Sequence, residues 1–324
     1  MLDLISIKEA LSHHGYEYEG FIGRGGFSNV FLCKSTKYNQ TFAVKKGEKD
    51  HMTKVEFDHL ISLDHSNIIK LYDVFNDHES QYLVMEYCPN GTILNKGCLS
   101  YDKFVYYAKQ ILEALAFCHA NNIVHGDIKP DNILLDQYDR IKLADFGLAR
   151  QFDINEKSSD KCGPMMLFPP EMFNMDEIDP FKADIYELGV TFYYMATGSY
   201  PYQRIKANDL KNAFLKTDIF STKNKIHPKI KELIDKMAER NAKELLTAEK
   251  LLKLPIFLPK IVNKQLNFYN TAGYRTKSNM CLESMRIDLN QPQAQSTDVL
   301  TYRSININPK ILKMNRIFQP KRTF

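Results

Sequence analysis

The chain has 324 residues, of which 44% are hydrophobic and 25% are charged, with 14 glycines and 13 prolines. This composition is typical of a globular protein and excludes collagen-like, mucin-like and wholly disordered classes. No apolar run approaches the roughly 20 residues that cross a bilayer, and the first residues lack the basic start and apolar stretch of a secretory signal. The six scattered cysteines form no CxxC pair, as in proteins with reduced thiols. We therefore expect a cytoplasmic protein, with the nucleus as the alternative.

The net charge of +4 is divided unevenly along the chain. Residues 259–324 hold 11 Lys and Arg against 3 Asp and Glu, so residues 1–258 carry a balance of −4. This change predicts a boundary near residue 258. The basic tail beyond it is either a solvated extension or a segment that docks on the rest of the chain, on an acidic surface or on a partner.

Strands dominate the first part of the chain. Segments 16–23, 29–35 and 41–46 alternate or are β-branched, and 67–75 and 81–88 predict two more strands. Between the third and fourth strands, apolar residues at helical spacing predict a helix over 54–63. We expect a small sheet-rich region over about 16–88, preceded by an extension at 1–15.

Beyond Gly91 the pattern becomes helical. Residues 100–121 place Phe104, Leu112 and Leu115 on one face, which predicts a long helix packed on a core. A hairpin follows over 132–147, and further helices are predicted at 182–198, 227–240 and 248–257. The predicted fold class is therefore α+β, with the small sheet-rich part followed by a larger helical part over about 89–258.

A glycine-rich segment lies between the first two predicted strands. Glycines let the backbone approach a polyphosphate and point N–H groups at it, while Val30 offers an apolar surface for a base. A simple hairpin turn is an equally good interpretation of the glycines alone. The residues of this candidate phosphate loop are Ile22, Gly23, Arg24, Gly25, Gly26 and Val30.

Two charged residues follow at suggestive positions. Lys45 ends the apolar strand Phe42-Ala43-Val44, and Glu56 opens the predicted helix eleven residues later. If that helix packs on the sheet, Glu56 can hold the ammonium of Lys45 against phosphate oxygens. Taken singly, a solvated lysine and an exposed glutamate are the simpler interpretations.

The strongest pattern runs from Ile123 to Asn132 and continues at Asp145-Phe146-Gly147. Two carboxylates, an amide and a lysine lie at two turns that flank one hairpin. This set is suited to bringing a hydroxyl, divalent cations and a phosphoryl group together.

On these motifs, residues 16–258 resemble a eukaryotic-type protein kinase of the serine/threonine branch, in which a lysine follows the catalytic aspartate by two residues. The resemblance implies a bilobal fold. It assigns Asp127 as the acceptor of the substrate hydroxyl proton and Lys129 to the transferred phosphoryl group, and it gives Mg²⁺ to Asn132 and Asp145. Lys45, paired with Glu56, is then the ligand of the ATP α- and β-phosphates.

The same resemblance assigns a nucleotide site between the lobes. Gly23 and Gly25 lie in its phosphate loop, and Val30 roofs the adenine. Ala43 and Leu134 sandwich the base, Met85 lines the back of the pocket, and the backbone from Glu86 to Cys88 bonds the base. It also implies a column of apolar side chains that aligns the lobes, formed by Leu60, Leu71, His125 and Phe146.

Three positions depart from the family pattern. The arginine that usually precedes the catalytic aspartate is Gly126, so the usual receiver of an activation-loop phosphate is missing. Between Asp145 and Glu171 there is no Thr or Tyr, and Ser158 and Ser159 are the only hydroxyl candidates. We therefore expect activity that does not depend on phosphorylation of this loop.

The other two departures concern Pro164, in place of a threonine that aligns the substrate, and Leu245, in place of the arginine that pairs with Glu171. Such losses keep a second function open, that of a catalytically impaired pseudokinase acting as a nucleotide-binding scaffold. A small-molecule kinase is a third alternative. The resemblance favours an active kinase with ATP, Mg²⁺ and a protein substrate as partners, with no role for nucleic acid and no transmembrane segment.

Overall fold

The computed structural model describes residues 2–25, 28–48, 51–78, 80–153, 156–159, 167–169, 172, 177–201, 226–238 and 246–258. All of these residues belong to one compact unit. None of its described helices is both long and apolar enough to span a membrane.

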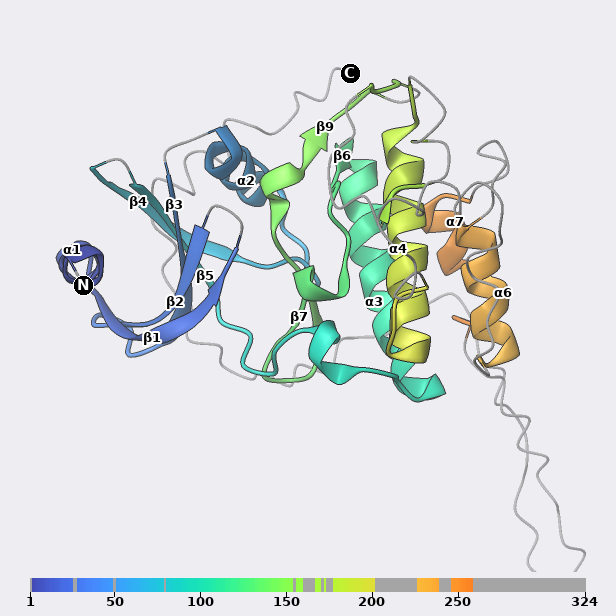
Figure 1. Cartoon of the computed structure of the whole chain (residues 1–324), viewed down its shortest axis with the longest axis horizontal. Coiled ribbons are helices and arrows are strands. Elements are labelled where there is room, and N and C mark those ends of the chain that lie inside the picture. Colours follow the sequence, from blue (N-terminus) through green and yellow to red (C-terminus); the bar gives the residue numbers. More distant parts are fainter. Residues whose placement is uncertain are drawn as a thin grey trace, which may run out of the picture. The chain divides into compact units, whose positions relative to one another are not determined.

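The amino-terminal part is a five-stranded antiparallel sheet with the order β1-β2-β3-β5-β4 (Figure 1). Helix α2 (His51–Ser62) lies between β3 and β4 in the sequence. The predicted strands and helix of this part are confirmed. The strands are β1 (Tyr16–Arg24), β2 (Ser28–Ser35), β3 (Thr41–Glu48), β4 (Leu71–Asp77) and β5 (Ser80–Glu86).

Strand β4 begins four residues later than predicted because the preceding residues pair elsewhere. Ile68 forms a parallel bridge with Leu143. The N–H of Ile69 donates to the carbonyl oxygen of Leu143 at 2.9 Å, and the N–H of Leu143 donates to the oxygen of Asn67 at 2.8 Å. The apolar run at 67–75 is therefore divided between the sheet and the helical part, which it connects.

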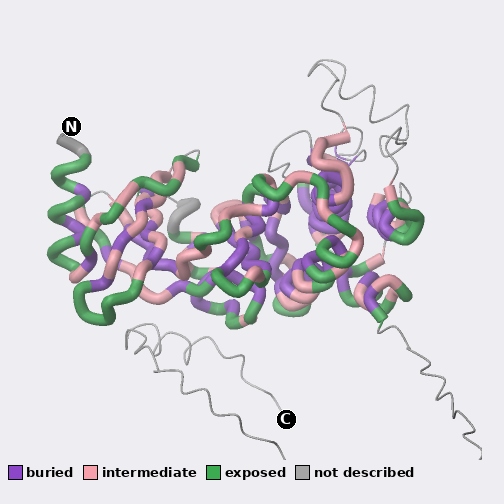
Figure 2. The backbone as a smooth tube through the Cα atoms, turned by 90° about the horizontal axis from the view of Figure 1, so that it is seen from below, coloured by how far each residue is buried: buried purple, intermediate pink, exposed green. Residues whose placement is uncertain are grey.

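Helix α1 (Leu2–His13) covers one face of the sheet, and the sequence analysis left these residues as an extension without predicted structure. Ile7, Ala10 and Leu11 are buried in one cluster with Val44 and Val84 of the sheet. Their i, i+3, i+4 spacing is the signal that would have predicted this helix. Figure 1 shows α1 beside β1, and Figure 2 shows the buried side of α1 turned toward the strands.

The strand register gives the sheet two unlike faces, since successive side chains point to opposite sides. Phe42 and Val44 of β3 point to the α1 face and are buried. Ala43 and Lys45 alternate with them on the other face, where Val30 lies opposite Lys45 and Met85 lies opposite Ala43. Val30, Ala43 and Lys45 are only half-buried, so this second face is the one left partly open.

The carboxy-terminal part is built on helices. The predicted helices and the hairpin are confirmed, and the helices pack around a core in which the rings of Phe104 and Phe192 meet at 5.4 Å. The elements are α3 (Tyr101–Ala120), α4 (Pro180–Thr197), α6 (Pro228–Met237), α7 (Ala248–Leu252), the hairpin of β7 (Ile133–Leu135) and β8 (Ile141–Leu143), the pair β6 (Ile123–Val124) and β9 (Arg150–Gln151), and the short 3₁₀ helices η1 (Ile93–Lys96), η2 (Pro130–Asn132) and η3 (Phe146–Leu148).

Helix α4 is the central helix of this part and is buried on nearly all sides. Gly189 permits its close contact with α6, because a Cβ atom there would lie only 3.1 Å from the Cβ of Met237. A helix that is apolar all round must lie inside a protein. Buried polar side chains on α4 therefore need hydrogen-bond partners. Asp184, Glu187 and Thr191 find theirs in residues 125–128.

Candidate active site

The segment from His125 to Asn132 connects β6 to β7 and is held from below by helix α4. We call residues 125–132 the catalytic loop. The two carboxylate oxygens of Asp184 accept hydrogen bonds from the backbone N–H groups of His125 and Gly126, each at 2.8 Å. The ring Nε2 of His119 lies 2.9 Å from the same carboxylate. Asp184 is fully buried, so these bonds compensate a charge that water cannot reach.

Asp127 lies at the centre of the catalytic loop with one oxygen bound and one unbound. Its Oδ2 accepts hydrogen bonds from Lys129 Nζ at 2.6 Å and from Asn132 Nδ2 at 2.9 Å. Its Oδ1 is buried and has no hydrogen-bond partner among the described residues. A buried acceptor without a partner is costly in a folded protein and calls for an explanation. Here it leaves one carboxylate oxygen of Asp127 free to accept a hydrogen bond from a ligand.

A second cluster joins three elements through Lys45. Its Nζ lies 2.5 Å from Glu56 Oε2 on α2 and 2.7 Å from Asp145 Oδ1, which follows β8. Burial alone would lower the pKa of Lys45, but Glu56 and Asp145 together raise it, so the side chain is an ammonium ion. The structure thus brings Lys45 and Glu56 together as the sequence predicted.

Asp145 is held in a left-handed backbone conformation, with φ of 65° and ψ of 69°. Non-glycine residues rarely adopt this region, and such strain is found most often at functional sites. Burial opposes its charge, but Lys45, with His125 and Lys129 adding to the effect, holds the pKa of Asp145 below its usual value. Because His125 and Lys129 belong to the catalytic loop, these effects indicate that the loop lies close to the Lys45 cluster.

The described residues offer oxygen ligands for a divalent cation but no closed metal site. No group of three or more His, Cys, Asp and Glu side chains gathers anywhere in the described ranges. The amide nitrogen of Asn132 is used on Asp127, which leaves its amide oxygen for another ligand, and the Asp145 side chain is 45% exposed. Mg²⁺ is usually bound by one or two protein oxygens together with substrate phosphates. This donor set fits that pattern.

The predicted nucleotide residues lie along the partly open face of the sheet and on the facing hairpin strand. Gly23 pairs with Val30, and Arg24 ends β1. The N–H of Gly25 donates to the carbonyl oxygen of Ser28 at 2.8 Å, and a Cβ atom at Gly25 would come within 2.9 Å of Ser28 Oγ, so a larger residue would require the Ser28 side chain to move. Ile22 is exposed, Leu134 of β7 is half-buried, and Gly26 lies outside the described residues.

The residues that follow this face on β5 connect the two parts of the molecule. Met85 is buried, and Glu86 bonds the other part through its side chain, since Lys142 Nζ of β8 lies 2.7 Å from Glu86 Oε2. Cys88 is half-buried, and burial with the nearby Glu86 raises the pKa of its thiol to about 12. Cys88 is therefore an uncharged thiol that contributes shape and backbone atoms.

The column of apolar side chains implied by the sequence is continuous with the core. Leu60, Leu71, His125 and Phe146 are all buried. The rings of His125 and Phe146 meet edge to face at 4.7 Å, and His125 Nε2 lies 3.1 Å from the carbonyl oxygen of Ala144. Leu60 of α2, Leu71 of β4 and Phe146 of η3 belong to one buried core cluster.

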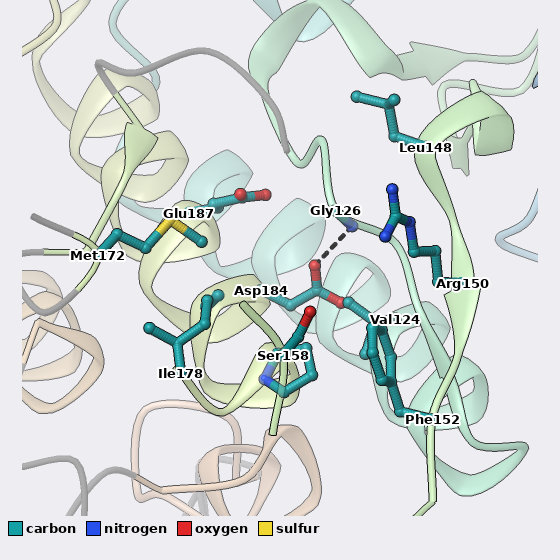
Figure 3. Close-up of a pocket in the computed structure, with 12 residues that line it drawn as sticks. Val124, Gly126, Leu148, Arg150, Phe152, Ser158, Met172, Ile178, Asp184 and Glu187 are labelled. Carbon is teal, nitrogen blue, oxygen red and sulfur yellow. Dashed lines mark hydrogen bonds between the residues drawn. The ribbon is translucent and has the colours of Figure 1, made fainter. Parts of the chain in front are cut away.

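Gly126 adopts a positive φ of 73°, and a Cβ atom there would lie 3.1 Å from the carbonyl oxygen of Leu148. A pocket lies beside it, lined by Gly126, Leu148, Met172 and Glu187 among others (Figure 3). Ser158 lines the same pocket and is buried, whereas Ser159 is exposed. The other departures from the family pattern, Pro164 and Leu245, lie outside the described residues, as does Glu171.

Sequence reasoning missed two polar residues that contact the catalytic loop. Glu187 Oε2 accepts a hydrogen bond from the N–H of Ile128 at 2.9 Å, and Thr191 Oγ1 donates to the oxygen of Ile128 at 3.1 Å. With Asp184 they are spaced i, i+3, i+7 on an otherwise apolar helix, which places them on one face. That spacing is the signal that could have identified them.

Comparisons with known proteins agree with this geometry. The family model described as a protein kinase domain matches residues 16–257. A CBL-interacting serine/threonine-protein kinase 2 of Arabidopsis thaliana is 30% identical over 250 residues, which is 73% of this chain and 55% of the relative. The serine/threonine-protein kinase Aurora-1 of the same plant is 30% identical over 247 residues, covering 72% of this chain and 83% of the relative. Sperm motility kinase Z of Mus musculus is 31% identical over 241 residues, covering 72% and 48%. The chain thus spans about half the length of several of these relatives.

Proposed function

The chain belongs to the protein kinase family and has its bilobal α+β fold, and on that premise we propose that it is an active serine/threonine kinase. It transfers the γ-phosphoryl group of Mg-ATP to a hydroxyl group of a protein substrate. The observation that carries the proposal is the buried, unpartnered Oδ1 of Asp127 beside Lys129 and Asn132. Two of the relatives named above, the CBL-interacting kinase 2 and Aurora-1, are serine/threonine kinases, and Lys129 matches the lysine expected of that branch.

Each charged side chain has a role that its position supports. Lys45, fixed by Glu56 and Asp145, binds the α- and β-phosphates as a point charge. Asn132 and Asp145 would hold Mg²⁺, which supplies positive charge to the phosphate oxygens. Asp127 orients the substrate hydroxyl through Oδ1 and accepts its proton, while Lys129 neutralises charge on the transferred group. The chemistry therefore consists of positioning and electrostatic stabilisation, with no covalent intermediate on the protein.

The adenine of ATP would lie on the partly open face of the sheet. Val30 and Ala43 cover it from the sheet and Leu134 from β7, and the backbone from Glu86 to Cys88 donates and accepts its hydrogen bonds. Ile22, Gly23, Arg24, Gly25 and Gly26 form the loop over the phosphates, and Met85 limits the depth of the site. Ligand pockets are lined mostly by apolar side chains that stay accessible when the ligand leaves, and the half-buried Val30, Ala43 and Leu134 fit this description.

We propose further that activity does not require phosphorylation of the segment after Asp145. Gly126 offers no cationic side chain to receive a phosphate. Ser158 is buried, and its backbone exchanges two hydrogen bonds with Ile178 at 3.0 and 2.9 Å. A phosphate on Ser158 would lie in a pocket that Asp184 and Glu187 also line. We expect full activity from the double variant Ser158→Ala with Ser159→Ala, and also from wild type after phosphatase treatment. Loss of activity in both experiments would contradict the proposal.

The direct test of the proposed function is transfer from Mg-ATP to a generic protein substrate. Wild type should phosphorylate the substrate, whereas Asp127→Asn should lose about 10²-fold or more in kcat, since general-base groups contribute this much. ATP affinity of the two proteins should be similar, because Asp127 is assigned to the hydroxyl. Equal transfer rates for wild type and Asp127→Asn would contradict the proposal.

The alternative function is a pseudokinase that binds nucleotide without transfer. It is favoured by the departures at Gly126, Pro164 and Leu245. Binding of ATP with no transfer by wild type to any protein substrate would support it. The two functions are thus separated by one pair of measurements on the same preparation.

Residues 259–324 lie outside the described residues. We keep two proposals for this basic segment, a docking segment and a solvated extension. Truncation before Pro259, followed by activity and localisation assays, separates a docking segment from a solvated extension. A docking segment would change one of the two readouts. We place the reaction in the cytoplasm, with the nucleus as the alternative, and the free thiols of Cys33, Cys88, Cys98 and Cys118 suit either compartment.

A further inference from the structure

Helix α4 presents three fully buried polar side chains to the catalytic loop, and one of them has no assigned role. Asp184, Glu187 and Thr191 are 0%, 1% and 0% exposed. Asp184 bonds the loop at His125 and Gly126. A glutamate almost never lies this deep without a partner, so the position of Glu187 calls for a physical reason.

The partner of Glu187 is the residue directly after Asp127. Its Oε2 accepts the N–H of Ile128 at 2.9 Å, and Thr191 Oγ1 donates to the oxygen of the same residue at 3.1 Å. Both backbone groups of Ile128 are therefore bonded to α4. Ile128 is itself fully buried, so neither group has water as a substitute.

The bonds of Glu187 complete a series along the loop. The N–H groups of His125 and Gly126 donate to Asp184, that of Asp127 donates to the ring Nδ1 of His125 at 3.3 Å, and that of Ile128 donates to Glu187. Four successive amides thus have defined acceptors. Gly126, in the middle of the series, is the residue with the greatest backbone freedom, and Glu187 restrains the chain on the far side of Asp127.

The rest of the Glu187 carboxyl group points into the pocket beside Gly126 (Figure 3). Among the described residues it makes no hydrogen bond besides that to Ile128. Burial raises the pKa of Glu187 well above its usual value, Asp184 and Asp127 raise it further, and the Ile128 N–H and Lys129 only partly oppose this. Arg150 lines the opposite side of the pocket. In its protonated form the carboxyl group can still accept the Ile128 N–H through its carbonyl oxygen.

We propose that Glu187 is a positioning residue for phosphoryl transfer, which holds the Ile128 amide and through it the carboxylate of Asp127. The inference rests on the proposed kinase activity for its kinetic test. Its structural content, that Glu187 fixes the Ile128 peptide, does not depend on that activity.

The test compares Glu187→Gln, which keeps a carbonyl acceptor, with Glu187→Met, which keeps the volume and removes the acceptor. Leaving a buried N–H without a partner costs enough to lower kcat by roughly tenfold in Glu187→Met. KM for ATP should stay near wild type, because Glu187 contacts no nucleotide residue. Glu187→Gln should restore most of kcat. The exposed Glu232→Ala on α6 is the matched control and should leave kcat unchanged.

A pH series tests the burial of the Glu187 carboxyl group, while the kcat against KM split and the rescue by Glu187→Gln test its positioning role. The raised pKa means that Glu187 contributes stability which is fully present below its ordinary value of 4.5 and is lost as pH rises through the folded-state pKa. The melting temperature of wild type should therefore fall relative to that of Glu187→Gln across that upper range. The difference should vanish toward pH 4.5, where both side chains are neutral.

The outcomes separate this inference from the proposed function. A folded Glu187→Met variant with kcat within about twofold of wild type would overturn the inference. If Glu187→Met does not fold, Glu187→Leu, which also removes the acceptor, takes its place, and unchanged kcat there has the same meaning. If wild type shows no transfer at all, hydrogen exchange of a peptide containing Ile128 still decides the point. Exchange should be faster in Glu187→Met than in Glu187→Gln, and equal rates would contradict the inference.

Discussion

The sheet and the helical part hold their functional side chains by different means. On the sheet, Lys45 is fixed by two ion pairs, to Glu56 on α2 and to Asp145 after β8. In the helical part, Asp127 is fixed by bonds from α4 to the backbone on either side of it. Ion pairs can be exchanged for a ligand's charges, whereas buried backbone bonds cannot. The comparison teaches that the side of the site proposed to bind nucleotide is adjustable and the side proposed to bind substrate is rigid.

The largest expected effect tests the rigid side. Asp184→Ala removes the acceptor of two backbone N–H groups and the partner of His119, all of them in the core. We expect the free energy of unfolding to fall by about 3–5 kcal/mol, as when one partner of a buried charged network is deleted. Urea unfolding measures it, with the exposed Asp235→Ala as the control. A loss below about 1 kcal/mol would mean that α4 does not fix the loop.

The next effect tests the adjustable side. Lys45→Met should lower kcat/KM by roughly 10²–10³-fold, because a preorganised charge on the phosphates is lost. Its stability should change much less than that of Asp184→Ala, since the high pKa of the buried Glu56 lets it take up a proton when the ammonium is gone. Lys46→Met, on the opposite face of β3, is the control for activity. Equal losses of unfolding free energy in Lys45→Met and Asp184→Ala would contradict the distinction between an adjustable and a rigid side.

A smaller effect concerns the helix that covers the sheet. Leu11 lies on the buried face of α1 and is 0% exposed, and Leu11→Ala should cost about 2–3 kcal/mol of stability through the cavity it creates. Activity at low temperature should be retained, because this face of the sheet is the one without site residues. Leu4→Ala, on the same helix and 40% exposed, should be close to neutral. Thermal unfolding and activity on the same samples check both statements.

The smallest effect concerns one hydrogen bond at the start of β1. Tyr16 donates to Asp73 Oδ2 at 3.1 Å, and burial with the nearby Asp73 raises the pKa of its hydroxyl. Tyr16→Phe should cost about 0.5–1.5 kcal/mol, the net worth of such a bond. Because the hydroxyl is uncharged at neutral pH, the cost should be the same at pH 6 and pH 8. Urea unfolding at both values measures it, and a marked pH dependence would contradict the assignment.

The sequence was most informative where function requires side chains at fixed spacing. Lys45 and Glu56 were placed together from their positions on a strand and a helix, and the structure joins them at 2.5 Å. Their assigned roles, like those of Asp127 and Asn132, stay predictions until they are tested. The five strands followed from alternation, which local chain geometry imposes.

Sequence reasoning failed where tertiary contacts override local pattern. The run at 67–75 appeared to be one strand, but Ile68 and Ile69 pair with Leu143 instead. Helix α1 is a different case: the i, i+3, i+4 spacing of its buried residues is present in the sequence, but the surface that stabilises a short helix is not. Glu187 was missed because its partner is a backbone amide 59 positions away, and backbone groups leave no mark in a sequence.

The cover of the sheet by α1 has a consequence for synthesis on the ribosome. The rings that α1 precedes are stacked in the order His14, Phe75 and Tyr82, with centroids 4.0 and 4.7 Å apart. The ribosome adds about 5–20 residues per second, so Ile7 and Leu11 emerge several seconds before their partners on β4 and β5. During that interval the apolar residues of this segment have no surface to cover, so the helix gains its packing only after β5 has been made.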